Sequence, residues 1–231
     1  MIGLVAAAAV FLLIHLLVSG TRLRDTITGA IGDGPYMGLF SLASIAALVW
    51  LGVAYAAARH GPDPAYWAAT PATKWVQLGV TFVAFMLAVP GLLTPNPTSV
   101  RQEATLDKPD AVRGMLRVTR HPFLWGVALW AAGHLMVNGD VASFVLFGSL
   151  LALAVFGTFS IDAKRRRMLG AKWDDFARQT SNIPFAAIAT GRQRFALSEA
   201  GWWRLAIAVI LWGAMVGAHP LLFGVSTFPG R

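Results

Sequence analysis

Residues 120–140, RHPFLWGVALWAAGHLMVNGD, decide the fold. Their centre is apolar and approaches the length of a membrane span, because a bilayer core of roughly 30 Å takes about 20 helical residues. Pro122 suits the first turn of this helix, where the missing N–H has no intrahelical partner anyway. His134 lies inside the helix, and an ionisable group at that depth indicates a functional or packing role. The Asn-Gly-Asp sequence at 138–140 predicts a tight turn into the next helix.

The composition places the chain among integral membrane proteins. It has 231 residues, of which 56% are hydrophobic and only 13% charged, with nine tryptophans and a mean hydropathy of +0.61. These values lie outside the usual range of soluble domains. The chain contains no cysteine, which excludes disulfides, thiolate metal ligands and cysteine nucleophiles.

Six apolar segments predict membrane spans, so we expect an all-α polytopic transmembrane bundle that forms one domain over residues 1–231. No basic residue precedes the first apolar run, which favours a retained first span over a cleaved signal peptide. The expected spans are 2–20, 35–58, 73–93, 122–138, 140–159 and 201–223.

The basic residues alternate between the two ends of this bundle. Segments 21–33, 94–121 and 160–200 hold 15 of the 19 lysines and arginines. The positive-inside rule therefore predicts that these three loops face the cytoplasm and that both termini lie outside. The net charge of +8 is then a topology signal, with membrane lipid as the expected partner and no nucleic acid.

Two histidines are expected deepest in the membrane, and each shares a helix face with further polar groups. His15 lies on one face with Arg22, and His134 lies on one face with Trp130 and Asn138. Two neutral imidazoles could hold the iron of a haem b while an arginine pairs with its propionates. Alternatively, each histidine makes an interhelical hydrogen bond and packs.

The expected depths of these histidines differ. At 1.5 Å per residue, His15 lies about 20 Å from the outer end of its helix and His134 about 18 Å from the inner end of an antiparallel helix. In a core of roughly 30 Å the offset between them is near 8 Å. His60 and His219, near the outer ends of their helices, are alternative partners for His134.

A basic segment precedes the fourth span. Residues 110–122, DAVRGMLRVTRHP, predict a surface helix that begins near Asp110. Arg113, Arg117 and Arg120 would share one face of it, which suits phosphates, propionates or a nucleotide-like cofactor. Contact with lipid head groups is the alternative.

The third expected span carries a polar stripe. Lys74, Gln77 and Thr81 follow one another at spacings of three and four residues. We interpret this stripe as polarity used in helix packing.

Two motifs resemble a known family. FLLIHLLVSGTRLR at 11–24 and TRHPFLWGVALWAAGHLMVNGD at 119–140 are similar to the NnrU family of bacterial membrane proteins, and through it to the 15-cis-zeta-carotene isomerases of plants and cyanobacteria. The resemblance covers most of the chain. It implies a haem b whose iron ligands are His15 and His134, and Ala131 stands where the isomerases have a cysteine one turn before the second histidine.

The same resemblance implies a bacterial inner (cytoplasmic) membrane location. The expected role is in denitrification and nitric oxide metabolism, with a denitrification enzyme as partner, or in redox-gated isomerisation of a hydrophobic polyene. Arg22 and either Arg117 or Arg120 are the expected partners of the haem propionates.

A second resemblance covers residues 117–184. RHPFLWG, then Asp162 and the segment LGAKWDDFARQTSNIPF, are similar to the isoprenylcysteine and phospholipid methyltransferases. This resemblance implies an S-adenosylmethionine site with Arg120, His121 and Asp162 around the methyl donor. A third possibility is a non-catalytic assembly partner, in which the buried histidines only join helices.

Overall fold

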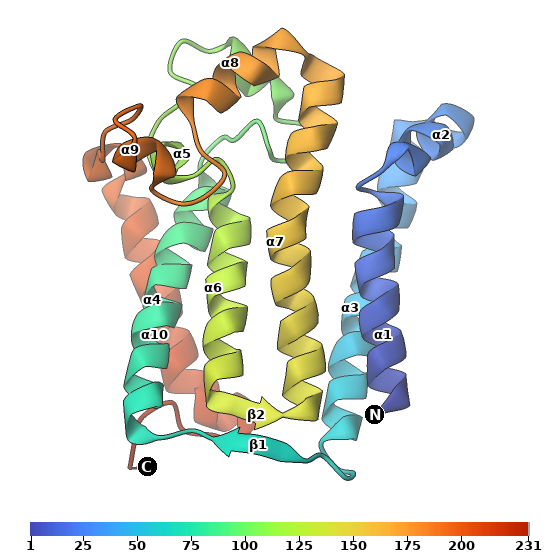
Figure 1. The fold of residues 1–231 in the computed structure, drawn as a ribbon, viewed down its shortest axis with the longest axis vertical. Helices are drawn as coiled ribbons and strands as arrows, with labels where there is room; N and C mark the ends of the chain where they lie inside the picture. The colour runs from blue at the N-terminus through green and yellow to red at the C-terminus, as the bar shows by residue number, and fades with distance from the viewer. Residues whose placement is uncertain (231) are drawn as a thin grey trace.

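The computed structural model describes residues 1–230, and six long helical segments dominate it (Figure 1). Each of the six expected spans is helical, which confirms the all-α polytopic bundle. These segments are α1 (Ile2–Leu13) with its continuation η1 (Ile14–Val18), α3 (Asp33–Ala58), α4 (Pro71–Leu93), α6 (Pro122–Val137), α7 (Val141–Leu169) and α10 (Trp202–Phe223).

Four of these helices, α3, α4, α7 and α10, are long and apolar enough to cross a membrane. The first span turns by 78° into α2 (Arg22–Ile31), and α6 is shorter, with 16 residues. The remaining elements are β1 (Ala65–Ala68), η2 (Glu103–Asp107), α5 (Met115–Val118), β2 (Asn138–Asp140), α8 (Ala171–Gln179), α9 (Ala186–Ala189) and η3 (Leu197–Ala200).

The bundle has two chemically different ends. Helices α2, α5, α8 and α9 gather at one end, here called the basic end, because the arginine- and lysine-rich connections lie there (Figure 1). At the opposite end β1 pairs antiparallel with β2 and joins the α3–α4 connection to the α6–α7 hairpin. Helix α1 begins and α10 ends at this opposite end, as the expected topology requires.

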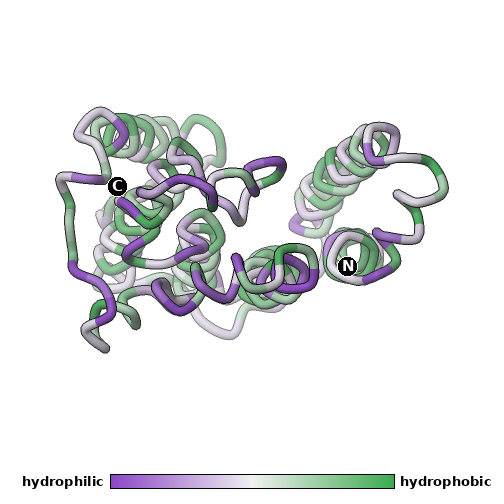
Figure 2. Tube along the Cα trace, turned by 90° about the horizontal axis from the view of Figure 1, so that it is seen from above, coloured by the Kyte–Doolittle hydropathy of each residue, from purple (hydrophilic) through white to green (hydrophobic). Residues whose placement is uncertain are grey.

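The helices form two groups that meet at α7. Helices α4, α6 and α10 pack together on one side, and α1 and α3 form a pair that also contacts α7 (Figure 2). Small residues allow the closest approach: an added Cβ at Gly126 of α6 would lie 2.7 Å from the carbonyl oxygen of Ala84 in α4. Small residues at the interface are typical of helix packing in membranes, because they let the backbones come close.

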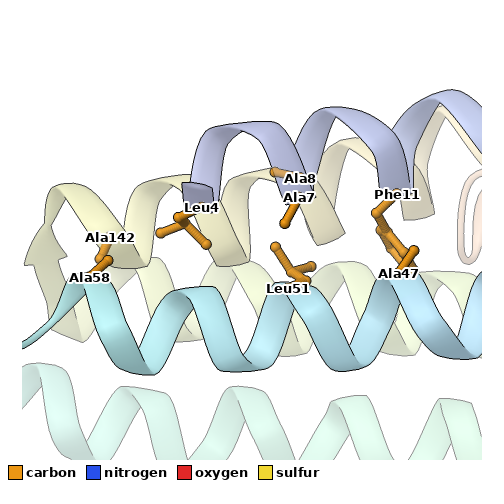
Figure 3. Close-up of a cluster of buried hydrophobic side chains, with 8 residues drawn as sticks. All are labelled: Leu4, Ala7, Ala8, Phe11, Ala47, Leu51, Ala58 and Ala142. Atoms are coloured by element: carbon orange, nitrogen blue, oxygen red, sulfur yellow. The ribbon is translucent and has the colours of Figure 1, made fainter. Parts of the chain in front are cut away.

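The α1–α3 pair has its own apolar core. Leu4, Phe11 and two alanines of α1 point toward Leu51 and Ala47 of α3 (Figure 3). Ala142 of α7 completes this cluster. Helix α1 is thereby fixed to both α3 and α7, which sets the position of the residues that follow it.

Local caps explain several helix starts. Thr70 and Thr73 form a capping box before α4, and Pro71 occupies its first turn. Pro122 begins α6 as expected, and Asp140 caps α7 by accepting a hydrogen bond of 2.7 Å from the Ser143 backbone N–H.

The structure corrects the helix expected over 110–122. Only Met115–Val118 is helical, because Gly114 has a φ of +56° and Thr119 is extended. His121 precedes a proline, which disfavours the helical conformation. Arg113, Arg117 and Arg120 therefore do not share a helix face.

Two further elements differ in extent from the expected span and turn. Helix α7 continues to Leu169 instead of ending near 159, so its last turns extend into the basic end. Residues 138–140 form strand β2 within their turn, because Trp67 of β1 packs on Gly139. The indole N–H of Trp67 also donates a hydrogen bond of 3.1 Å to the Met136 carbonyl.

Candidate functional site: two membrane histidines

His15 lies in a π turn at the end of the first span. The turn is closed by a 3.1 Å hydrogen bond from the Ser19 backbone N–H to the Ile14 carbonyl, five residues back. Such π turns inside helices occur frequently at functional sites. The Nδ1 atom of His15 lies 2.8 Å from the Phe11 carbonyl oxygen, and Nε2 has no hydrogen-bond partner among residues 1–230.

Aromatic rings from α1 and α3 surround His15. Its ring centroid lies 4.5 Å from that of Phe11 and 5.4 Å from that of Phe40. Tyr36 stacks on Phe40, and the buried hydroxyls of Tyr36 and Ser44 have no hydrogen-bond partner in the described part of the chain. The side of α3 near His15 therefore combines apolar surface with two available hydroxyl groups.

His134 has a closely similar arrangement on α6. Its Nδ1 lies 2.7 Å from the Trp130 carbonyl oxygen, again four residues back. The ring stacks on Phe147 of α7 with a distance of 4.7 Å between ring centroids and an angle of 24° between ring planes. The centroid of the Trp130 ring lies 4.4 Å from that of His134. Gln77 of α4 is the polar neighbour, with its amide nitrogen 3.2 Å from Nδ1.

Both histidines favour the same tautomer. An Nδ1 atom 2.7–2.8 Å from a carbonyl oxygen carries the proton and donates it, because two lone pairs at that distance would repel. At His134 this assignment requires the Gln77 amide to face Nδ1 with its oxygen, because its nitrogen is itself a donor. The unprotonated Nε2 then points away from its own helix with a free lone pair. A ring nitrogen hydrogen-bonded to a backbone carbonyl is the usual orientation of a metal-ligating histidine.

The relative heights of the two histidines follow from their contacts with α7. The Ser160 hydroxyl of α7 donates a hydrogen bond of 3.3 Å to the Gly20 carbonyl, and Phe147 of the same helix stacks on His134. Phe147 and Ser160 are separated by about 20 Å along α7, and His15 precedes Gly20 by about 7 Å. His15 therefore lies roughly 12 Å nearer the basic end than His134.

The antiparallel course of the helices inclines the two rings toward each other's height. Helix α1 runs toward the basic end and α6 runs away from it (Figure 1). A ring held by the carbonyl four residues earlier leans toward its own helix N-terminus. His15 thus leans away from the basic end and His134 toward it, into the interval between them. The two rings share no aromatic neighbour and no hydrogen-bond partner among residues 1–230.

The three arginines expected at the propionates occupy different surroundings. Arg22, at the start of α2, is exposed, and its guanidinium has no ion pair or hydrogen bond in the described part. Arg117 makes a bidentate ion pair with Glu199, at 2.7 and 3.0 Å, and also donates to Gln193. Arg117 holds the pKa of Glu199 below its usual value.

Arg120 belongs to a separate charged cluster at the start of α6. Its guanidinium binds Asp162 of α7 through two nitrogens, with Nε–carboxylate distances of 2.9 and 3.0 Å. The same carboxylate lies 2.7 Å from His121 Nε2 and accepts a 3.1 Å bond from Asn182. Burial lowers the pKa of His121, although Asp162 opposes this shift.

This cluster joins the residues expected around a methyl donor. Arg120, His121 and Asp162 do meet, but their polar groups are directed at one another. The His121 Nδ1 atom remains buried without a partner among the described residues. The cluster connects α6, α7 and the segment after α8 through hydrogen bonds, so it stabilises their packing.

Sequence reasoning missed several of the groups around the two histidines. Gln77 was interpreted as packing polarity, and its contact with His134 was not foreseen. The π turn at His15 has no proline or glycine signature within it. Phe40 and Phe147 come from helices with little amphipathic pattern, so nothing in the sequence marked which side of each helix would face a histidine.

No group of three or more His, Cys, Asp or Glu side chains that could hold a metal ion lies among residues 1–230. The donor set of this site is therefore two separate imidazoles, which suits a cofactor that already supplies the other ligands of its metal. Haem is a group of this kind, because its porphyrin leaves only the axial positions to the protein.

The chain was compared with known proteins. A family model described as NnrU protein matches residues 3–227. The 15-cis-zeta-carotene isomerase of Arabidopsis thaliana chloroplasts is 33% identical over 162 residues, which is 66% of this chain and 41% of the relative. The Zea mays enzyme of the same name is 29% identical over 149 residues, 62% of this chain and 39% of the relative.

The chain spans about two fifths of the length of these two relatives. No solved structure matches it significantly.

Proposed function

Since the chain belongs to the NnrU family, we propose that this polytopic membrane protein binds one haem b through His15 and His134. We propose further that it uses this haem to isomerise a hydrophobic polyene within the membrane. The similarity to two proteins named 15-cis-zeta-carotene isomerase supports the reaction class.

One observation carries the haem proposal. Each histidine donates Nδ1–H to the carbonyl four residues earlier, so both present a free Nε2 lone pair. Both rings also lean toward each other's height, across a height difference of roughly 12 Å along the bundle axis. Neutral imidazoles with this tautomer are suitable axial ligands for haem iron.

Arg22 is the best candidate among the three arginines for the propionates. Arg117 and Arg120 already neutralise Glu199 and Asp162. Arg22 is exposed without a partner in the described part. It follows His15 by seven residues, beyond the 78° bend between the first span and α2, so the two residues do not share a helix face as expected. An arginine pairs well with a carboxylate, because its N–H groups match the two oxygens.

The residues around the histidines suit an apolar substrate. Phe11, Phe40, Trp130 and Phe147 offer aromatic surfaces and exclude water from the imidazoles. Bound haem supplies a redox-active iron at this place. Isomerisation leaves the atoms and charge of a polyene unchanged, so no group has to be transferred to or from the substrate.

The other expected roles have less support. Nothing in the structure bears on denitrification or nitric oxide, so this role stays a prediction. Methyl transfer would require Arg120, His121 and Asp162 to turn toward a donor, whereas they are engaged with one another.

Optical spectroscopy tests the haem site. The protein is expressed with haem precursor, purified in detergent, and measured oxidised and after reduction with dithionite. We expect sharp α and β bands in the reduced protein and their loss in His15→Ala and His134→Ala. His60→Ala is the matched control, because His60 is exposed and lies in the α3–β1 connection. A colourless protein at full haem supply, with normal folding, would refute the proposal.

The reaction is tested separately. Haem-loaded protein in liposomes is given 15-cis-zeta-carotene under reducing conditions, and the isomers are resolved by chromatography. Conversion should require both histidines. A coloured protein that leaves the isomer ratio unchanged would sustain the haem site and reject the reaction.

A further inference from the structure

Two neighbouring grooves lie at the basic end, apart from the histidine site. The larger has a volume of about 930 Å³ and lies between residues 106–113, helix α8 and the start of α10. The smaller, of about 320 Å³, lies between the end of α4 and residues 101–108. Lys108 lines both grooves, so the two share a border.

The larger groove carries two unneutralised positive charges. Five basic side chains line it, and three of them have a carboxylate 2.7 Å away: Arg113, Arg117 and Lys172. Lys108 and Arg204 have no carboxylate within 4.0 Å among residues 1–230. The carboxylates of Asp107, Asp110, Asp175 and Glu199 also line the groove, which leaves a net charge of +1. Lys108 and Arg204 are therefore the positions at which the groove attracts an anion.

Arg204 is held in a fixed orientation. Its Nε donates a hydrogen bond of 3.1 Å to the Leu93 carbonyl, and one terminal nitrogen donates a hydrogen bond of 3.4 Å to the Ala200 carbonyl. Its guanidinium lies 4.7 Å from the centre of the Trp203 ring. The other terminal nitrogen has no partner in the described part. A guanidinium ordered in this way loses little entropy when it binds an anion.

Apolar surface adjoins these charges. Leu92 and Leu93 line the smaller groove, and Leu92 is 60% exposed. Trp203, at the start of α10, lines the larger groove and is 42% exposed. Tryptophan at the end of a spanning helix is typical of the membrane interface, where one side of the ring is apolar and the other wet. A ligand here would meet positive charge at one end and apolar surface at the other.

We propose that the two grooves form a binding site for the phosphate head group of an anionic membrane lipid. Lys108 and Arg204 bind the phosphate, and the head group occupies the larger groove, whose ion pairs offer further donors and acceptors. The acyl chains leave past Leu92 into the membrane. Charge-assisted bonds from lysine and arginine are the usual way in which phosphates are held.

Native mass spectrometry of the full chain tests this proposal. The probes are phosphatidylglycerol, phosphatidylcholine of the same acyl chains, and glycerol phosphate without chains. We expect tightest binding for phosphatidylglycerol, and an affinity about fivefold weaker in Lys108→Gln and in Arg204→Gln. Lys108 is exposed in a loop, so its variant should fold even if the Arg204 variant does not.

Arg166→Gln is the control of equal charge. Arg166 is exposed, pairs with Asp174 and lies outside both grooves. Undiminished lipid binding by this control supports a specific site. An equal loss in the control would mean that net charge alone attracts lipid, which overturns the proposal. Binding of glycerol phosphate as tight as that of the lipid would overturn the lipid assignment in favour of a soluble phosphate ester.

Discussion

His15 and His134 lean toward each other along the bundle axis, although they belong to antiparallel helices at different depths. The cause is the same in both helices: Nδ1 is bound to the carbonyl one turn earlier, at 2.8 and 2.7 Å. Because the two helices run in opposite directions, the same local rule inclines the two rings toward each other's height. The offset in depth is thus compatible with a shared site.

Replacing Asp162 with Asn should destabilise the protein strongly. Arg120 would then remain charged and mostly buried without its carboxylate, since the two side chains are only 12% and 15% exposed. Breaking a buried pair from one side costs about 3–5 kcal/mol. Thermal unfolding in detergent measures the change. The double variant Arg120→Met, Asp162→Leu should recover much of the loss, and no recovery would contradict the account.

The stability of the protein should fall as the pH drops below about 6.5, partly because of His121. Burial lowers the pKa of this imidazole in the folded state, although Asp162 raises it and Arg120 adds to the lowering. The unfolded chain therefore takes up the proton at a higher pH, and stability is lost from about pH 6.5 downward. His121→Gln should show a shallower loss of melting temperature between pH 7.5 and 5. A slope identical to that of the parent protein would rule out this role.

Gly126→Ala should destabilise the α4–α6 contact. Its added Cβ would lie 2.7 Å from the Ala84 carbonyl oxygen and 2.9 Å from the Ala88 backbone nitrogen, which cannot move independently. Such overpacking costs about 1–3 kcal/mol. Gly148→Ala on α7 is the control, because nothing lies within 4 Å of its added Cβ. Helix propensity should make this control neutral or more stable, and both variants are compared by denaturant titration.

Arg22 and Arg117 should respond differently to substitution by Gln. In Arg22→Gln we expect normal thermal stability and about fivefold weaker haem retention, measured by transfer to apomyoglobin. In Arg117→Gln we expect lower thermal stability, because Glu199 loses its bidentate partner. Unchanged haem retention in Arg22→Gln would remove this residue from the proposed site.

The fold was largely predictable from the sequence, because apolar length alone defines membrane spans. All six expected segments are helical, and the basic loops lie at one end. The local helix over 110–122 was predicted wrongly, since the positive φ of Gly114 and the extended Thr119 interrupt a convincing arginine spacing. Backbone conformation at single residues is weakly encoded in such spacing.

The candidate site was predictable only in part. His15 and His134 were singled out because charge-capable groups are rare inside spans. Their neighbours Gln77, Phe40 and Phe147 depend on how helices rotate about their axes. Spans that are apolar on every side carry little information about this rotation, so the sequence alone could not assign these contacts.

The two-stranded sheet has a consequence for the order of biosynthesis. Strand β1 is translated about 70 residues before its partner β2. At roughly 5–20 residues per second, the Ala65–Ala68 edge waits about 4–14 s for pairing. The α3–α4 connection thus reaches its final form only after α6 has been inserted. The α6–α7 hairpin, which follows His134, therefore also completes the structure of the first half of the protein.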